Sequence, residues 1–215
     1  PDGRIIDGRG QVLMPGLIDM HTHRQMQGYA YGDRMGRVLL AMGITATRSP
    51  GCPAYHMVED REAIDAGLRV APRHYATGEA LDGSRIYYNF MRPVTEPGQM
   101  ALELERARAL SYDMIKTYVR MDHKTQADVI ASAHRMGLHV SSHYHYPALR
   151  NGADCTEHLG ATSRYGYSRT ITALGAGYED VNRLFAAARA GRTPTLFTGG
   201  VLLADDPGML DDPRI

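Results

Sequence analysis

Two histidines separated by a single residue are the feature of this sequence that most directly indicates chemistry. His21 and His23 end the stretch MPGLIDMHTH, residues 14–23, directly after a short apolar run. In a β-strand, side chains at positions i and i+2 point to the same face, so both imidazoles would project together from the end of the strand. Two neutral imidazoles side by side form half of a typical metal site. An H-x-H pair taken alone fits a structural role equally well.

The elements that must hold these histidines alternate along the chain. Short apolar or β-branched runs predict strands at 17–21, 44–48, 74–79, 112–118, 138–144, 154–158 and 194–198. Amphipathic stretches predict helices near 33–42, 54–66, 98–110, 124–136 and 179–190, with a short connector at 147–152. This alternation indicates a parallel sheet, open or closed into a barrel. We therefore predict an α/β fold of the (β/α)₈ TIM-barrel type that is incomplete, because only about seven strand–helix units are present and a closed barrel usually takes about 250 residues.

The helix predicted at 124–136 has the clearest pattern. A spacing of i, i+3, i+4 and i+7 predicts that its buried side contains Ala127, Ile130, Ala131 and His134. Glycines stand where three helices should end in the left-handed conformation: Gly67, Gly137 and Gly191.

Length and composition favour one main domain. The chain has 215 residues, 43% of them hydrophobic, which suffices for one sizeable core. Residues 1–16, rich in Gly and Asp, are predicted to be the remnant of a small β-domain, and residues 17–215 to form a barrel that stops before an eighth strand. Lys plus Arg equal Asp plus Glu at 24 each, so the charge balance favours neither nucleic acid nor an anionic membrane as a partner.

Three further residues are predicted at the same edge of the barrel as the histidine pair. Reactive groups of β/α barrels gather at the C-terminal ends of the strands. Successive predicted strands place there Lys116 in YDMIKTYV, His143 in HVSSHYHYP and His158 in CTEHLG. A lysine flanked by apolar residues is costly unless its ammonium group reaches water or a partner. Each residue alone has a structural explanation, but unrelated structural residues have no reason to share one end of successive strands, so a metal site is favoured.

These motifs resemble those of the amidohydrolase superfamily, the metal-dependent hydrolases built on a (β/α)₈ barrel. The resemblance lies in PGLIDMHTH, in IK on the fourth strand, in a histidine after the fifth and in EH after the sixth. Four stretches are more similar still to the amidohydrolase domain that follows a Tol-type β-propeller in large bacterial proteins: SRIYYNFMRPVTEPGQ, DMIKTYVRM, SSHYHYPALRNGADCTEHLGATSRYGYS and TPTLFTGG. Because the N-terminal part of such a protein is missing here, the compartment stays open between cytoplasm and periplasm.

The resemblance implies a centre of two divalent metal ions. His21 with His23 would bind one ion, His143 with His158 the second, and Lys116, carboxylated by CO₂, would bridge them. A lysine in a dry strand can lose its proton, and its carbamate is an anion with two oxygens. Zinc is the expected metal, although imidazole and carboxylate ligands also suit manganese, nickel and iron. Water activated there as hydroxide would attack the carbonyl of an amide.

Four residues are candidate substrate contacts. His145 shares strand parity with His143 and is either the alternative metal ligand or a substrate contact. Tyr118, Arg85 and Arg164 follow strands at the same edge, where ordinary surface packing explains them equally well.

One acidic residue is expected to lie away from these candidates. Glu157, beside His158, has the opposite strand parity and should point away from the barrel interior, toward the helices.

One expected element of the family is absent from the sequence. The aspartate of the eighth strand, which handles the proton of the attacking water, has no counterpart, since the remaining candidates stand in a predicted loop: Asp205, Asp206, Asp211 and Asp212. The catalytic base therefore stays unassigned. The expected function is hydrolysis of carbon–nitrogen bonds in a small amide or dipeptide-like molecule. The alternative is an inactive barrel fragment that binds a ligand or partner, and the open barrel edges predict homo-oligomers.

Overall fold

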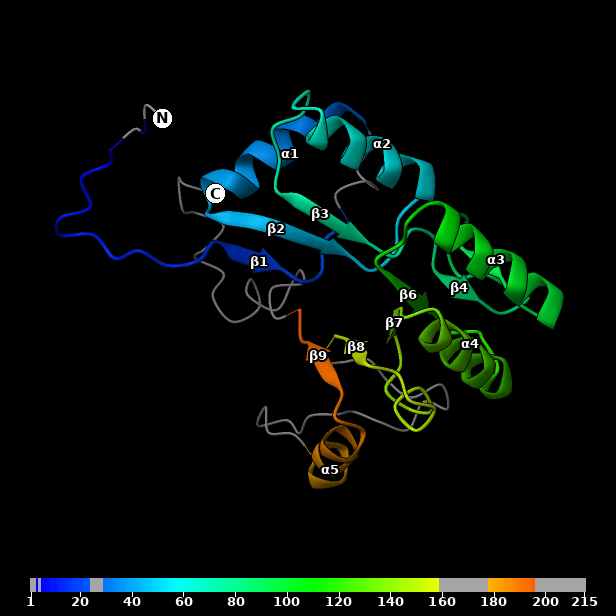
Figure 1. Cartoon of the computed structure of the whole chain (residues 1–215). Coiled ribbons are helices and arrows are strands. Elements are labelled where there is room, and N and C mark those ends of the chain that lie inside the picture. Colours follow the sequence, from blue (N-terminus) through cyan, green and yellow to red (C-terminus); the bar gives the residue numbers. More distant parts are fainter. Residues whose placement is uncertain (1–2, 4, 24–28, 159–177, 196–215) are drawn as a thin grey trace, which may run out of the picture.

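The computed structural model describes residue 3 and residues 5–23, 29–158 and 178–195. Strands and helices alternate along these residues (Figure 1). The strands are β1 (Leu17–Asp19), β2 (Ile44–Ser49), β3 (Arg73–Ala76), β4 (Leu81–Asp82), β5 (Arg92–Pro93), β6 (Met114–Thr117), β7 (His139–Ser142), β8 (Cys155–Glu157) and β9 (Gly191–Thr193). The helices are α1 (Tyr29–Ala41), α2 (Ala54–Asp65), α3 (Pro97–Ala109), α4 (His123–Arg135) and α5 (Glu179–Ala188).

All strand pairs of the described chain are parallel. One sheet has the order β1-β2-β3 and the other the order β5-β4-β6-β7-β8-β9. The two sheets meet where the amide of Asp113 donates to the carbonyl of Ala76 at 2.9 Å. Figure 1 shows the strands as a curved arc with α1 to α4 along its outer side. The prediction of an α/β fold with parallel strands is thus confirmed, and the C-terminal ends of β1, β6, β7 and β8 face one region.

A single hydrophobic core lies between the strands and the helices. Its side chains come from strands of both sheets and from helices α2, α3 and α4, and all of them are buried. Its members include Met57, Leu81, Val94, Leu104, Ile115, Val129, Ile130 and Val140. This packing fixes the strands whose ends carry the candidate site. No described helix has the length and apolar character needed to cross a membrane.

Helix α4 shows how the local signals work and where they mislead. The Asp122 side chain caps its N-terminus by accepting from the amide of Thr125 at 2.9 Å, and Gly137 follows its end with a φ of 76°. Its buried side, however, consists of Gln126, Val129, Ile130, Ser132 and Ala133. Of the predicted side, Ile130 is buried and Ala127 half-buried, whereas the prediction was wrong for Ala131 and His134, which are exposed. Gln126 is turned inward because its amide donates to the hydroxyls of Thr117 and Ser142, a pairing that apolar periodicity does not reveal.

Three further differences concern the ends of elements. The last described strand, β9, begins at Gly191 and precedes the predicted range, of which residues 196–198 lie outside the described part. Gly191 is therefore a strand residue, and the left-handed position after α5 is taken by Arg189, with a φ of 51°. Strands β4 and β5 were not predicted, because two-residue strands are too short to show an alternating pattern.

Candidate metal centre

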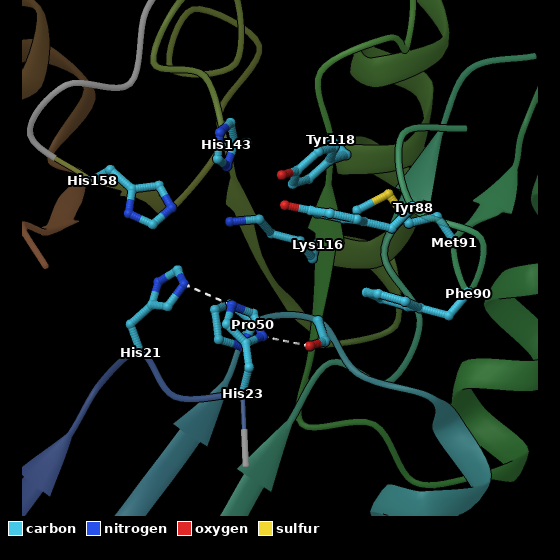
Figure 2. Close-up of a pocket in the computed structure, with 11 residues that line it drawn as sticks. His21, His23, Pro50, Tyr88, Phe90, Met91, Lys116, Tyr118, His143 and His158 are labelled. Carbon is cyan, nitrogen blue, oxygen red and sulfur yellow. Dashed lines mark hydrogen bonds between the residues drawn. The ribbon is translucent and has the colours of Figure 1, made fainter. Parts of the chain in front are cut away.

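His21 and His23 face each other through the same ring nitrogen. Their Nε2 atoms lie 3.0 Å apart. Figure 2 marks this contact with a dashed line. The Nδ1–H of His23 donates to the carbonyl of Gly51 at 2.8 Å, and the Nδ1 of His21 lies 2.8 Å from a carboxylate oxygen of Glu157. A carbonyl and an ionised carboxylate can only accept, so each Nδ1 carries a proton, and a ring with no second proton presents the lone pair of Nε2. Two lone pairs at this distance repel unless a proton or a cation lies between them.

Burial makes a second proton on His23 unfavourable. Desolvation lowers the pKa of His23, outweighing the opposing hydrogen bond to Gly51, and the neighbouring His21 and Lys116 lower the pKa further. Neutral imidazoles with Nδ1 tied to a fixed acceptor are the usual state of metal-binding histidines. The pair is thus arranged as two nitrogen ligands directed at one point.

Lys116 extends from β6 toward the histidines (Figure 2). Its side chain is 1% exposed, and among the described residues its Nζ has no hydrogen bond. The nearest carboxylate oxygen, on Glu157, is 3.8 Å away. Desolvation lowers the pKa of Lys116 to about 8 against the opposing attraction of Glu157. A buried ammonium group normally donates hydrogen bonds to several acceptors, and the Lys116 amine donates none among the described residues.

His143 and His158 complete the ring of histidines. His143 follows β7, and its ring centroid lies 5.0 Å from that of His158, which in turn lies 4.6 Å from that of His21. The Nδ1 of His158 is 2.7 Å from the hydroxyl of Thr195, which leaves its Nε2 for another partner. Burial, together with the nearby Lys116 and neighbouring histidines, lowers the pKa of His143 to about 3 and that of His158 to about 4. Both rings are therefore neutral at physiological pH.

These side chains surround one cavity of about 320 Å³. Figure 2 shows the four histidines on one side, the Lys116 amino group pointing between them, and aromatic side chains on the other. The lining consists of His21, His23, Pro50, Gly51, Tyr88, Phe90, Met91, Lys116, Tyr118, His143 and His158. All five residues predicted as metal ligands thus share this cavity, although their role as ligands stays a prediction. In the residues that the structure covers, no group of three or more His, Cys, Asp or Glu side chains is arranged to hold a metal ion.

Glu157 and Arg48 are buried beneath the histidines, where the sequence did not place them. Glu157 accepts hydrogen bonds from His21, from Arg48 at 2.5 Å and from the hydroxyl of Ser141. Burial raises the pKa of Glu157, but Lys116, His21 and Arg48 outweigh it and hold that pKa well below its usual range. The expectation that Glu157 points toward the helices was wrong. Strand parity failed because His158, the reference residue, has a φ of 68° and no longer follows the alternation of β8.

The four predicted substrate contacts lie in different places. Tyr118 lines the cavity, with its ring 4.5 Å from that of His143. His145 is 2% exposed, is not part of the lining, and has neither ring nitrogen hydrogen-bonded within the described structure. Arg85 is exposed and also outside the lining. Arg164 lies outside the described residues. Their contacts with substrate stay predictions.

Sequence comparisons add little to this geometry. No family model matches the chain. A dihydroorotase from Syntrophus aciditrophicus (strain SB) is 46% identical over 44 residues, which are 20% of this chain and 10% of that protein.

Several solved structures share the fold. The crystal structure of an amidohydrolase superposes with a TM-score of 0.74 at 20% identity, covering 97% of this chain and 59% of that one. A Xaa-Pro dipeptidase with methionine bound in its active site gives a TM-score of 0.68 at 18% identity over 89% of this chain and 55% of that one. The ochratoxinase of A. niger gives a TM-score of 0.64 at 17% identity, covering 85% of this chain and 52% of that one. The chain thus spans little more than half the length of these proteins. At these identities the likeness is one of fold, which this chain shares with the amidohydrolase, the dipeptidase and the ochratoxinase.

Proposed function

We propose that this chain carries the metal centre of a hydrolase that cleaves carbon–nitrogen bonds. The observation that carries the proposal is the pair of Nε2 atoms of His21 and His23, 3.0 Å apart, with both Nδ1 atoms already engaged. Two such nitrogens are stabilised by a shared cation. A divalent metal ion bound there supplies Lewis-acid polarisation of a carbonyl and a nucleophile from water at neutral pH.

The remaining ligands fit a second ion. His143 and His158 present neutral rings to the same cavity, and Lys116 lies between the two histidine pairs (Figure 2). Carboxylation of Lys116 by CO₂ would turn its amine, which has no hydrogen bond among the described residues, into an anion with two oxygens. That group would add the ligand that the histidines alone lack. We propose two divalent ions, with zinc as the expected metal.

Other residues of the chain hold these ligands in place. Glu157 keeps the proton of His21 on Nδ1, and Arg48 holds Glu157 through its guanidinium. Arg48 in turn donates to the carbonyl of Met20 at 2.7 Å, which ties β2 to the segment that carries the histidine pair. Partners of this kind fix the tautomer and direction of a metal-binding histidine.

We propose a small amide or dipeptide-like molecule as the substrate. The support comes from the fold neighbours, among them a Xaa-Pro dipeptidase, an ochratoxinase and a prolidase in complex with N-methylphosphonate-L-proline. We also propose that residues 17–215 are a barrel without its eighth strand and residues 1–16 the remnant of a β-domain. The fold neighbours are longer than the part that this chain matches, which is 52–59% of three of their chains.

The metal content of the purified chain tests the proposal. Protein prepared without chelator, in bicarbonate buffer with added zinc, should contain about two metal ions per chain by mass spectrometry, as in other two-metal sites. The double variant His21→Asn/His23→Asn should lose at least one of them. The matched control His134→Asn/His139→Asn removes two histidines near Asp154, outside the cavity, and should keep the metal content. Equal metal content in both double variants would refute the assignment and favour a non-catalytic barrel segment.

A further inference from the structure

The side of the cavity opposite the histidines is aromatic and apolar. Tyr88, Phe90, Met91 and Tyr118 form it (Figure 2). The rings of Tyr88 and Phe90 are nearly parallel, with an interplanar angle of 6° and centroids 5.7 Å apart. The ring of Tyr118 lies 5.8 Å from that of Tyr88 at an angle of 53°. We name this surface the aromatic wall. Aromatic rings bind other planar rings by offset stacking or edge-to-face contact.

The aromatic wall is held rigidly from behind. Asp82 accepts from the amide of Tyr87 at 2.9 Å and from the amide of Arg120 at 2.6 Å, which joins the loop after β4 to the loop after β6. A Cβ at Gly83 would lie 2.1 Å from the carbonyl oxygen of Arg120, so the two loops are in direct backbone contact. A surface that is already ordered binds its ligand without a further loss of conformational entropy.

A second cation, Arg120, holds the loop that carries the wall and is not part of the cavity lining. The guanidinium of Arg120 donates to the carbonyls of Arg85 and Ile86 and lies 5.0 Å from the centroid of the Tyr87 ring. Tyr88 nevertheless stays 43% exposed, on the edge of the cavity. Exposed aromatic surface beside a cavity that also holds a few polar groups is typical of a ligand site.

We propose that the substrate is a neutral amide whose carbonyl carries a planar aromatic ring, and that this ring packs against Tyr88 and Phe90. The inference rests on the proposed hydrolase function, because the aromatic wall and the histidines share one cavity. The hydroxyls of Tyr88 and Tyr118 point toward the amino group of Lys116 (Figure 2). A ring on the wall therefore places its amide on the polar side. A cavity of about 320 Å³ is at the small end for ligand sites, which favours a single ring.

Two small amides of equal charge and similar size test this preference. Benzamide is planar and aromatic, whereas cyclohexanecarboxamide is neither. Binding of each to the 215-residue chain is measured by NMR titration, in bicarbonate buffer with zinc and again in its absence. We expect benzamide to bind about three- to tenfold more tightly, the range that ring–ring contacts add beyond area burial. Equal binding of the two amides would overturn the proposal.

Variants of the wall make the test specific. Tyr88→Leu and Phe90→Leu should remove most of the preference for benzamide, whereas Tyr88→Phe, which keeps the ring, should retain it. Tyr55→Leu changes an exposed tyrosine on α2 and should leave both affinities unchanged. Circular dichroism checks that the variants fold. A preference that survives in both leucine variants would overturn the proposal.

These experiments distinguish failure of the aromatic-wall proposal from failure of the proposed hydrolase function. A preference for benzamide in a chain that binds no zinc would support the aromatic wall and contradict the hydrolase. Normal zinc content without the preference would contradict the aromatic wall alone. Release of ammonia from benzamide but not from cyclohexanecarboxamide would support both.

Discussion

Glu157 is the residue on which the electrostatics of the cavity depend. Its carboxylate is completely buried and pairs with His21 at 2.8 Å and with Arg48, and it is the nearest anion to Lys116 among the described residues. One negative charge thereby faces two buried cations, Arg48 and Lys116, and accepts the Nδ1–H of His21. Removing that charge leaves Arg48 uncompensated and releases the tautomer of His21.

Replacing Glu157 by Gln should weaken zinc binding. We expect a loss of about 10- to 100-fold in affinity, the usual effect of removing the partner of a metal-binding histidine. Competition with a chromophoric chelator measures it. Glu103→Gln is the matched control, because Glu103 is also buried and paired with an arginine, Arg92, but lies outside the cavity. Equal zinc affinities in the two variants would show that Glu157 stabilises the fold without positioning His21.

Asp154 gives a residue-scale prediction on acid stability. Burial raises its pKa, but hydrogen bonds from the amide of Val140 at 2.7 Å and from His134 at 2.8 Å outweigh this and lower the pKa below 3.8. The folded state therefore binds the proton less readily than the unfolded state. The stabilisation is complete above the unfolded pKa and is lost as the pH falls through the folded pKa.

The variant Asp154→Asn should be less stable at neutral pH and nearly as stable as the wild type at low pH. We expect its unfolding free energy to fall by about 1–2 kcal/mol at pH 7. This is the usual contribution of a hydrogen bond to a charged group, reduced because Asp154 is partly exposed. Urea denaturation at about pH 7 and about pH 3 measures the difference. Asp128→Asn removes an exposed carboxylate that pairs with Lys124 and should change little. A constant difference between wild type and Asp154→Asn at both pH values would contradict the prediction.

At the scale of elements, the loop after β4 is positioned by close backbone contact. Gly83→Ala places a Cβ against the carbonyl of Arg120 and must push the two loops apart. We expect a loss of about 1–3 kcal/mol in unfolding free energy, typical of overpacking, together with weaker benzamide binding. Gly98→Ala, in the first turn of α3, meets nothing within 4 Å and should raise stability by less than about 1 kcal/mol. Thermal unfolding of both variants measures these changes in stability. A Gly83→Ala variant as stable as the wild type would contradict the close contact between the two loops.

The sequence predicted the elements well where a pattern extends over several residues. All five described helices and the strands β1, β2, β3, β6, β7 and β8 lie where periodicity or end signals indicated. The cavity likewise gathers His21, His23, Lys116, His143 and His158, because parallel strands place their C-terminal ends at one edge. Local patterns gave the wrong orientation for side chains whose partners are distant in sequence, such as Gln126 of α4 and Glu157 of β8. Their buried positions follow from hydrogen bonds to residues of strands β2, β6 and β7.

At the scale of the whole molecule, the two outer strands of the arc border an apolar groove. Within the described structure, β1 pairs with β2 alone and β9 with β8 alone. Leu17 and Ile18 are 50% and 60% exposed, and residues of β1 and β9 line the groove between them. Unpaired strand edges with apolar side chains invite pairing with another chain.

We expect the 215-residue chain to self-associate through this groove at micromolar concentration. Ile18→Arg places a charge on the edge of β1 and should shift the elution in sizing chromatography toward the monomer, because edge charges oppose strand pairing. Leu68→Arg is the control, since Leu68 is 85% exposed but lies after α2, away from the groove. A wild-type chain that elutes as a sharp monomer peak would contradict the prediction. The zinc site at the end of β1 provides a second readout: association through this edge would hold His21 and His23 in place, so zinc affinity should rise with protein concentration in the wild type and not in Ile18→Arg.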